Sequence, residues 1–173
     1  DGIAMGHEAM KASLVSREVI ADSVELSVRG HCYDGIVGLA GCDKSLPGLM
    51  MAMVRLNIPS VFIYGGSILP GNYKGKDLTI IDVFEAVGKH ASGEIDEKEL
   101  KNIEKVACPT AGSCGGQFTA NTMACISEAL GLALTNSAMT PATYEERDNY
   151  GFESGKAVMD LICLLYTSPS PRD

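Results

Sequence analysis

One stretch of the chain constrains its fold more than any other: two short apolar segments that flank a helix-forming segment. Residues 34–40 and 60–64 have the length and composition of buried strands. Residues 48–56 between them are rich in Leu and Met, begin just after Pro47 and end at Asn57-Ile-Pro59. Strand, helix and strand at this spacing predict a βαβ unit with parallel strands and a right-handed crossover.

The rest of the chain is predicted to be mainly helical, so the expected fold class is α/β, a parallel sheet with a βαβ crossover flanked by helices. Ser16 is placed to cap a helix that runs through Val28 and stops at Gly30. Thr79 opens a Thr-x-x-Asp capping pattern. The expected helices are 16–28, 48–56, 79–91, 96–106, 118–134 and 153–162.

Composition limits the classes of function. The 173 residues fall in the size range of one domain, and 46% are hydrophobic, enough for a core. The net charge of −8 argues against a nucleic-acid surface, which normally carries a basic stripe. No apolar run approaches the roughly 18 residues of a membrane helix, so a soluble protein is expected. Six cysteines without a signal peptide favour a cytoplasmic location (an organellar matrix or stroma in a eukaryote) and free thiols.

Both ends of the chain are interpreted as cuts. The chain begins Asp-Gly-Ile-Ala-Met, with neither an initiator methionine nor a targeting pattern, which favours a start in mid-protein over processing. Residues 163–173 change character and resemble a conceptual translation of a sequencing-library adapter; the alternative is a natural disordered C-terminus. The domain is therefore assigned to residues 1–162, and Cys163 is left out of the chemistry.

Two loops follow the carboxyl ends of the predicted strands, and ligands of open α/β sheets gather at this rim. Cys42-Asp43-Lys44 follows the first strand, and Tyr64-Gly-Gly-Ser67 follows the second. A thiolate prefers iron–sulfur or zinc, whereas a carboxylate prefers magnesium or manganese, so the first loop has ligands for two kinds of metal. The alternative is structural: a buried cysteine, an aspartate that caps the next helix and a solvated lysine.

A second candidate is the loop 107–117, whose glycines and proline indicate a tight turn that leads into a helix. Backbone amides there would face an anion or the sulfides of a cluster. Cys108 and Cys114 have five residues between them, which fits neither a zinc knuckle nor a local ferredoxin motif. Any cluster would therefore be assembled from distant loops, and a metal role and a structural role both stay open. The remaining thiols and imidazoles are not assigned to a metal: Cys32 and Cys125, expected in the core, and His7, His31 and His90.

Several motifs occur in a fixed order along the chain. They are Asp1-Gly-Ile-Ala-Met-Gly-His-Glu8, Ser16-Arg-Glu-Val-Ile-Ala-Asp-Ser-Val24, Cys42-Asp-Lys-Ser-Leu-Pro-Gly48, Tyr64-Gly-Gly-Ser-Ile-Leu-Pro-Gly71, Ala107-Cys-Pro-Thr-Ala-Gly-Ser-Cys-Gly-Gly-Gln-Phe-Thr-Ala-Asn-Thr-Met123 and Glu128-Ala-Leu-Gly131. Over residues 1–162 the chain resembles the dihydroxy-acid/phosphogluconate dehydratase family, and within it the dihydroxy-acid dehydratases. The resemblance implies an incomplete N-terminal domain of a larger two-domain enzyme. It also implies a hydro-lyase that converts 2,3-dihydroxy-3-methyl carboxylates to 2-keto acids in branched-chain amino-acid synthesis.

The resemblance further implies a set of ligands. Cys42 and Cys114 match two of three cysteines that hold a [2Fe–2S] cluster, and the third would lie before Asp1. Asp1 and Asp43 match magnesium ligands, and Lys44 matches a carbamylated lysine that binds Mg²⁺ as an anion. A glutamate ligand and a serine base would belong to the C-terminal domain. The chain by itself is therefore expected to be inactive.

The expected partners are a small dihydroxy acid and, as the family suggests, a second copy in a homodimer; neither nucleic acid nor a membrane is expected. Two other functions stay open. One is a sugar-acid or phosphogluconate dehydratase of the same family, which the motifs 5–8 and 65–71 disfavour. The other is a non-catalytic α/β module that binds zinc or an anion at its rim.

Overall fold

The predicted βαβ unit is confirmed in the computed structural model, which describes residues 6–167. Strands β1 (Ile36–Ala40) and β2 (Ser60–Tyr64) pair in parallel, in register from Ile36↔Ser60 to Ala40↔Tyr64. Helix α3 (Ser45–Leu56) connects them, with Pro47 in its first turn. It ends at Asn57, which adopts the left-handed conformation (φ 51°) that often terminates helices.

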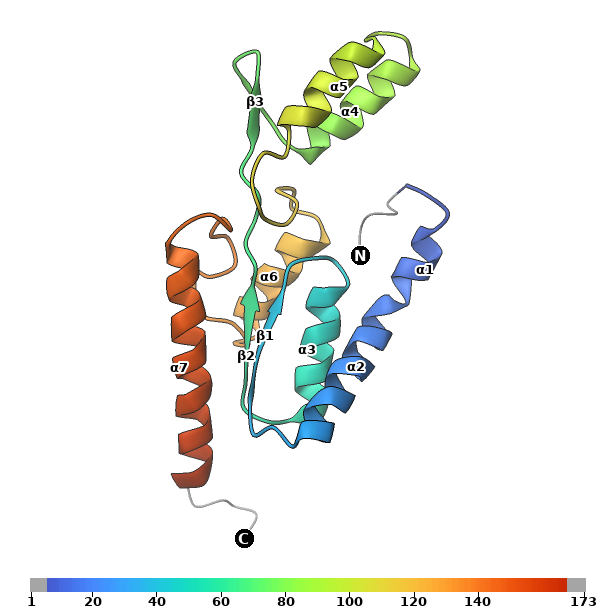
Figure 1. Cartoon of the computed structure of the whole chain (residues 1–173). Helices are drawn as coiled ribbons and strands as arrows, with labels where there is room; N and C mark the ends of the chain where they lie inside the picture. The colour runs from blue at the N-terminus through green and yellow to red at the C-terminus, as the bar shows by residue number, and fades with distance from the viewer. Residues whose placement is uncertain (1–5, 168–173) are drawn as a thin grey trace.

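Helices cover both faces of this small sheet (Figure 1). Helix α7 (Glu146–Thr167) packs against one face and α3 against the other, and α2 (Ser16–His31) packs on the outer side of α3. A short helix, α1 (Met10–Leu14), precedes α2. The core lies between the sheet, α3 and α6 (Thr119–Ala129), and consists of Ala40, Leu46, Leu49, Met50, Met53, Phe62, Tyr64, Ala120, Ala124 and Ala138.

The two strands differ in burial. β2 is buried from Val61 onward, as the sequence predicts, but the prediction of a buried strand is wrong for β1, where Val37 is 42% and Leu39 68% exposed. β1 forms one edge of the sheet. The other side of β2 is covered, because the Phe62 N–H donates to the Leu132 carbonyl at 2.7 Å and Ala133 forms a parallel bridge with Phe62.

This pairing explains why α6 is shorter than the predicted helix 118–134. The helix ends at Ala129, and Gly131 (φ 73°) turns the backbone away from the helical path. Residues 132 and 133 then lie extended beside β2. A tertiary hydrogen bond therefore overrides an apolar pattern that favours helix.

Other helices also depart from their predictions, and α3 begins at Ser45 instead of residue 48. Ser16 does not cap α2, because its hydroxyl donates to the Ser13 carbonyl of α1 at 2.7 Å. The helix passes Gly30 and ends at Cys32, which is exposed and left-handed (φ 54°), so its expected place in the core is wrong. Cys125 is partly buried against the core. Helix α7 begins before the predicted residue 153 and runs past Ile162.

A hairpin and two helices project beyond the carboxyl ends of the strands (Figure 1). The hairpin, β3 (Gly71–Tyr73) and β4 (Lys76–Leu78), was not predicted; its turn residues Lys74 and Gly75 both have positive φ, typical of a two-residue hairpin loop. Helices α4 (Ile80–Ala91) and α5 (Glu97–Val106) match their predictions, and α4 has the expected capping box at Thr79. Among the described residues, no helix has both the length and the apolar character needed to cross a membrane.

Candidate metal centre

The loop between β1 and α3 holds its three candidate ligands in different environments. Cys42 is exposed, whereas Asp43 and Lys44 are each only 8% exposed. The Cys42 carbonyl closes the loop by accepting hydrogen bonds from the Leu46 N–H (3.0 Å) and the Ser45 hydroxyl (3.2 Å). The structural alternative of a buried cysteine, a capping aspartate and a solvated lysine is wrong, because Lys44 is buried and α3 has no side-chain cap.

Asp43 and Lys44 form a buried ion pair. The Lys44 Nζ donates to Asp43 Oδ2 at 3.1 Å. The other carboxylate oxygen, Oδ1, is buried and has no hydrogen-bond partner among residues 6–167. A buried carboxylate oxygen normally accepts a hydrogen bond or binds a cation, because leaving it unsatisfied costs free energy. Asp43 therefore has one buried oxygen that could accept a hard cation, and its assignment to magnesium stays a prediction.

Backbone pairing brings the distant 107–117 loop to the same rim. The Ser113 N–H donates to the Gly66 carbonyl (2.9 Å), and the Ser113 carbonyl accepts from the Ile68 N–H (2.7 Å). The Ser113 hydroxyl also donates to the carbonyl of Gly41, although these two residues are 72 positions apart. These contacts hold Cys114 next to the loop that carries Cys42.

Cys114 is partly buried where these loops meet. Burial raises the pKa of its thiol, and the neighbouring Cys42 raises it further, whereas the backbone N–H of Gly116 lowers it. A free thiol with a raised pKa is protonated at neutral pH, so a metal would have to displace its proton. Cys108 is exposed and lies within electrostatic range of the Cys114 thiol. The structure thus brings together Cys42, Asp43, Lys44 and Cys114 and leaves Cys108 nearby.

The described residues do not complete a metal site by themselves. Among residues 6–167 there is no group of three or more His, Cys, Asp or Glu side chains that could hold one metal ion. The remaining predicted ligand, Asp1, lies outside the described residues. The donors that are present nonetheless fit the implied groups by their chemistry: two thiols suit an iron–sulfur cluster, and the free carboxylate oxygen of Asp43 suits Mg²⁺.

Sequence reasoning missed a buried polar chain behind Cys114. The Tyr64 hydroxyl donates to Asn121 Oδ1 at 2.6 Å. The Asn121 Nδ2 in turn donates to the backbone carbonyls of Cys114 (3.1 Å) and Gly116 (2.6 Å). Asn121 belongs to the long motif that begins at Ala107. The one sequence signal for its role was a polar residue at a core position of an apolar helix.

Arg147 is a second residue that the sequence did not single out. Its guanidinium is buried and donates to the Tyr64 carbonyl (2.7 Å), the Ser137 carbonyl (2.8 Å) and the Thr140 carbonyl. Burial lowers the pKa of the guanidinium, and Tyr64 opposes this shift. Arg147 therefore ties the end of β2 to the segment that follows α6.

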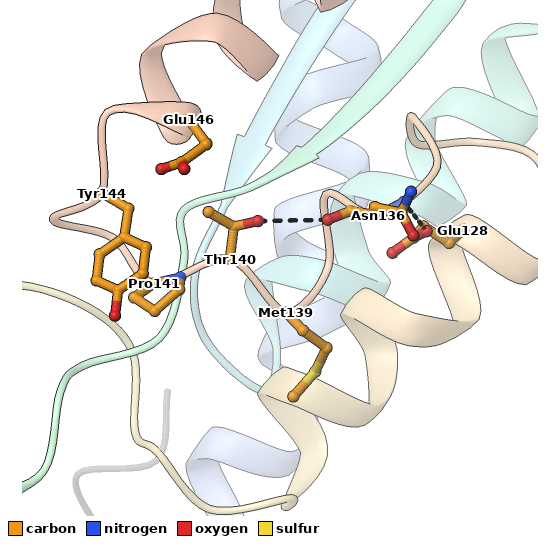
Figure 2. Close-up of a pocket in the computed structure, with 7 residues that line it drawn as sticks. All are labelled: Glu128, Asn136, Met139, Thr140, Pro141, Tyr144 and Glu146. Carbon is orange, nitrogen blue, oxygen red and sulfur yellow. Dashed lines mark hydrogen bonds between the residues drawn. The ribbon is translucent and has the colours of Figure 1, made fainter.

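A surface pocket lies beside the segment that follows α6 (Figure 2). It encloses about 470 Å³ and is lined by Glu128, Asn136, Met139, Thr140, Pro141, Tyr144 and Glu146. The Glu128 carboxylate accepts hydrogen bonds from the N–H groups of Asn136 and Ala138, so its role there is to hold the backbone. Of the predicted ligands that the structure describes, Cys42, Asp43, Lys44 and Cys114, none lines this pocket.

The chain also matches known proteins along its length. Residues 1–173 match the family described as dihydroxy-acid/6-phosphogluconate dehydratase N-terminal. This chain belongs to that family. The dehydratase resemblance predicted from the motifs is confirmed.

Relatives in the family include dihydroxy-acid dehydratases from distant organisms. The chain is 73% identical over 173 residues to that of Pelagibacter ubique, covering 100% of this chain and 30% of the relative. It is 74% identical over 162 residues to that of Dinoroseobacter shibae, covering 94% and 28%. With the protein of Sulfurisphaera tokodaii it shares 59% over 173 residues, covering 100% and 30%. The chain thus spans about three tenths of the length of these dehydratases.

Gly66 packs closely against the backbone of Ala142 at this rim, and we expect Gly66→Ala to be strongly destabilising. Gly66 has a φ of +93°, and a Cβ there would lie 2.6 Å from the Cα and N of Ala142. Alanine would combine backbone strain with a clash against backbone, at a cost of about 3 kcal/mol. Thermal unfolding of the full-length variant measures this.

The matched control for this substitution is Gly75→Ala. Gly75 also has a positive φ (+79°), but a Cβ there would meet nothing within 4 Å. We expect a cost of only about 1 kcal/mol from the strain alone. Equal losses of stability in the two variants would show that the clash between a Cβ at residue 66 and Ala142 adds nothing to the cost.

Proposed function

We propose that the protein containing this chain is a dihydroxy-acid dehydratase that converts 2,3-dihydroxy-3-methyl carboxylates to 2-keto acids in branched-chain amino-acid synthesis. The observation that carries the proposal is the meeting of soft and hard donors on one rim: the thiols of Cys42 and Cys114 beside the free oxygen of Asp43. The names of the relatives agree with it. Cys42 and Cys114 would hold a [2Fe–2S] cluster, and Asp1, Asp43 and Lys44 would hold Mg²⁺.

When bound, these groups would supply Lewis acidity for departure of the C3 hydroxyl and positive charge beside the substrate carboxylate and C2 oxygen. Asp43 and Lys44 are the residues of the described chain that bear on this role. In the unmodified chain, Lys44 pairs with Asp43 through Oδ2, and Asp43 Oδ1 stays without a partner among the described residues. Protonated Lys44 has no acceptor atom, so it would bind a cation only as a carbamate, which forms when the ammonium loses one proton and the resulting amine bonds to the carbon of CO₂ and loses a second.

The test is to purify the full-length protein without oxygen and to measure iron, acid-labile sulfide, visible absorption and 2-keto acid formation. We expect a brown protein that turns over 2,3-dihydroxy-3-methylbutanoate in the presence of Mg²⁺. Turnover of 6-phosphogluconate instead would favour the other activity of the family. An active protein that is colourless and free of iron would refute the cluster.

We expect Cys42→Ser and Cys114→Ser to lose most of the bound iron. Each substitution removes a thiolate ligand. The affinity for iron should therefore fall by more than the roughly 10–100-fold that follows loss of a residue that only hydrogen-bonds to a metal ligand. Iron per protein chain after desalting is the measurement. Cys32→Ser is the control, because Cys32 is also exposed but lies at the end of α2. Equal iron in all three variants would contradict the assignment.

A further inference from the structure

A buried polar chain connects the end of β2 to the loop that presents Cys114. Tyr64 has no exposed surface, and Asn121 is 2% exposed. The Tyr64 hydroxyl donates to Asn121 Oδ1, and Asn121 Nδ2 donates to the carbonyls of Cys114 and Gly116. The oxygen and the nitrogen of the Asn121 amide are thus both in use, and both of its protons point at the cysteine loop.

The two carbonyls that Asn121 holds stand on either side of Gly115. Fixing them fixes the peptide planes that follow Cys114, and with them the direction in which the thiol leaves the backbone. The backbone N–H of Gly116 lies beside the Cys114 thiol. The Asn121 hydrogen bond to the Gly116 carbonyl therefore steadies the residue whose N–H acts on the sulfur.

A simple packing role explains this arrangement poorly. Two apolar side chains would fill the same space between β2 and α6 without burying polar groups, and buried polar networks stabilise a fold only when every member is satisfied. Here every bond of the chain leads toward the Cys114 loop rather than toward solvent or a surface charge.

We propose that Tyr64 and Asn121 are positioning residues, which hold Cys114 and the Gly116 N–H in the geometry that binds and tunes an iron–sulfur cluster. The inference rests on the proposed function, which makes Cys114 a cluster ligand. Residues behind a ligand usually change metal affinity by about 10–100-fold, and hydrogen bonds to cluster sulfurs are one determinant of reduction potential.

The experiment uses the full-length protein with its cluster assembled. Asn121→Leu removes both donors while keeping a similar volume, and Tyr64→Phe removes only the hydroxyl that orients the Asn121 amide. Iron release to a chelator is followed by visible absorption at a temperature well below unfolding, and the reduction potential of the cluster is measured on the same samples. Turnover is not needed for either readout.

We expect Asn121→Leu to lose its cluster about 10–100-fold faster than the wild type, with a smaller acceleration in Tyr64→Phe. The reduction potential should become more negative in both variants, because a less well-placed N–H stabilises the extra electron of the reduced cluster less. The matched control is Tyr73→Phe, which removes a tyrosine hydroxyl bonded to Glu99 at 2.9 Å in the hairpin region and should leave both readouts unchanged.

The inference would be overturned if both variants released iron at the wild-type rate and had the wild-type reduction potential. A lower unfolding temperature in these variants would then indicate a purely structural role. If Asn121→Leu does not fold, Tyr64→Phe decides, because it keeps the ring that fills the core. A wild-type protein that binds no iron would refute the proposed function and this inference together, so the two failures are distinguishable.

Discussion

Replacing Asp43 by asparagine in the full-length protein should strongly slow the proposed magnesium-dependent dehydration while the fold persists. Asparagine is close to isosteric, so the loop between β1 and α3 can keep its shape. It lacks the negative charge of the carboxylates through which proteins usually bind Mg²⁺. In the chain with unmodified Lys44, it also removes the charged partner of the buried ammonium at 3.1 Å. We expect a fall in kcat of at least about 10²–10³-fold, the size of effect when one group that stabilises developing charge is lost.

Initial rates across a series of magnesium concentrations measure this effect, and circular dichroism checks the fold. The control is Asp22→Asn, because Asp22 is exposed and pairs with Arg55 at the surface, where such pairs contribute little. Asp22→Asn should keep the wild-type rate and magnesium dependence. Wild-type kinetics in Asp43→Asn would show that the free Oδ1 of Asp43 has no metal to bind.

The βαβ unit was predictable because its signals are local. Two short apolar segments and a helix between Pro47 and Asn57 determine both strand direction and the crossover. The same reasoning places the Cys42 loop at the carboxyl end of β1. Whether β1 is buried, however, depends on what lies beside it, and no pattern within residues 34–40 states that Leu39 is exposed.

The candidate site was predictable only in part, because its geometry arises from contacts between distant segments. The motifs name Cys42 and Cys114, but the parallel bridge between Ser67 and Ser113 that brings their loops together has no local signature. The same holds for Tyr64 and Asn121, which are 57 positions apart. In the sequence, Tyr64 and Asn121 are simply polar groups within apolar segments. Their shared role is visible only once the hydrogen bond between them is known.

We expect Arg147→Met to destabilise the fold more than any other substitution of a polar residue named above. Arg147 is 8% exposed and donates to three carbonyl oxygens, those of Tyr64, Ser137 and Thr140. No described carboxylate forms an ion pair with it within residues 6–167, so its charge is balanced only by these carbonyls and by the faces of Tyr64 and Tyr150. Methionine would keep much of the volume and leave the buried oxygens of Tyr64 and Ser137, and the partly buried oxygen of Thr140, without the guanidinium donor.

Each unsatisfied carbonyl costs about 1–3 kcal/mol, and removal of a buried charge returns part of that, so we expect a net loss of about 3–5 kcal/mol. In a domain of this size the midpoint of thermal unfolding should fall by about 10 °C. Arg55→Met is the control, because its ion pair with Asp22 at 2.7 Å is at the surface and should contribute at most about 1 kcal/mol.

Arg147→Lys separates the charge from the geometry of the guanidinium. A lysine ammonium carries the same charge, but it is a compact donor and cannot span carbonyls of β2 and of the segment 137–140 as the planar fork does. If the hydrogen bonds stabilise this junction, Arg147→Lys should be nearly as unstable as Arg147→Met. If Arg147→Lys unfolds at the wild-type temperature, the charge alone matters, and the carbonyls of Ser137 and Thr140 do not need the guanidinium. Because these carbonyls adjoin Pro141, which bridges to Ser67, the unstable variants should also hold less iron.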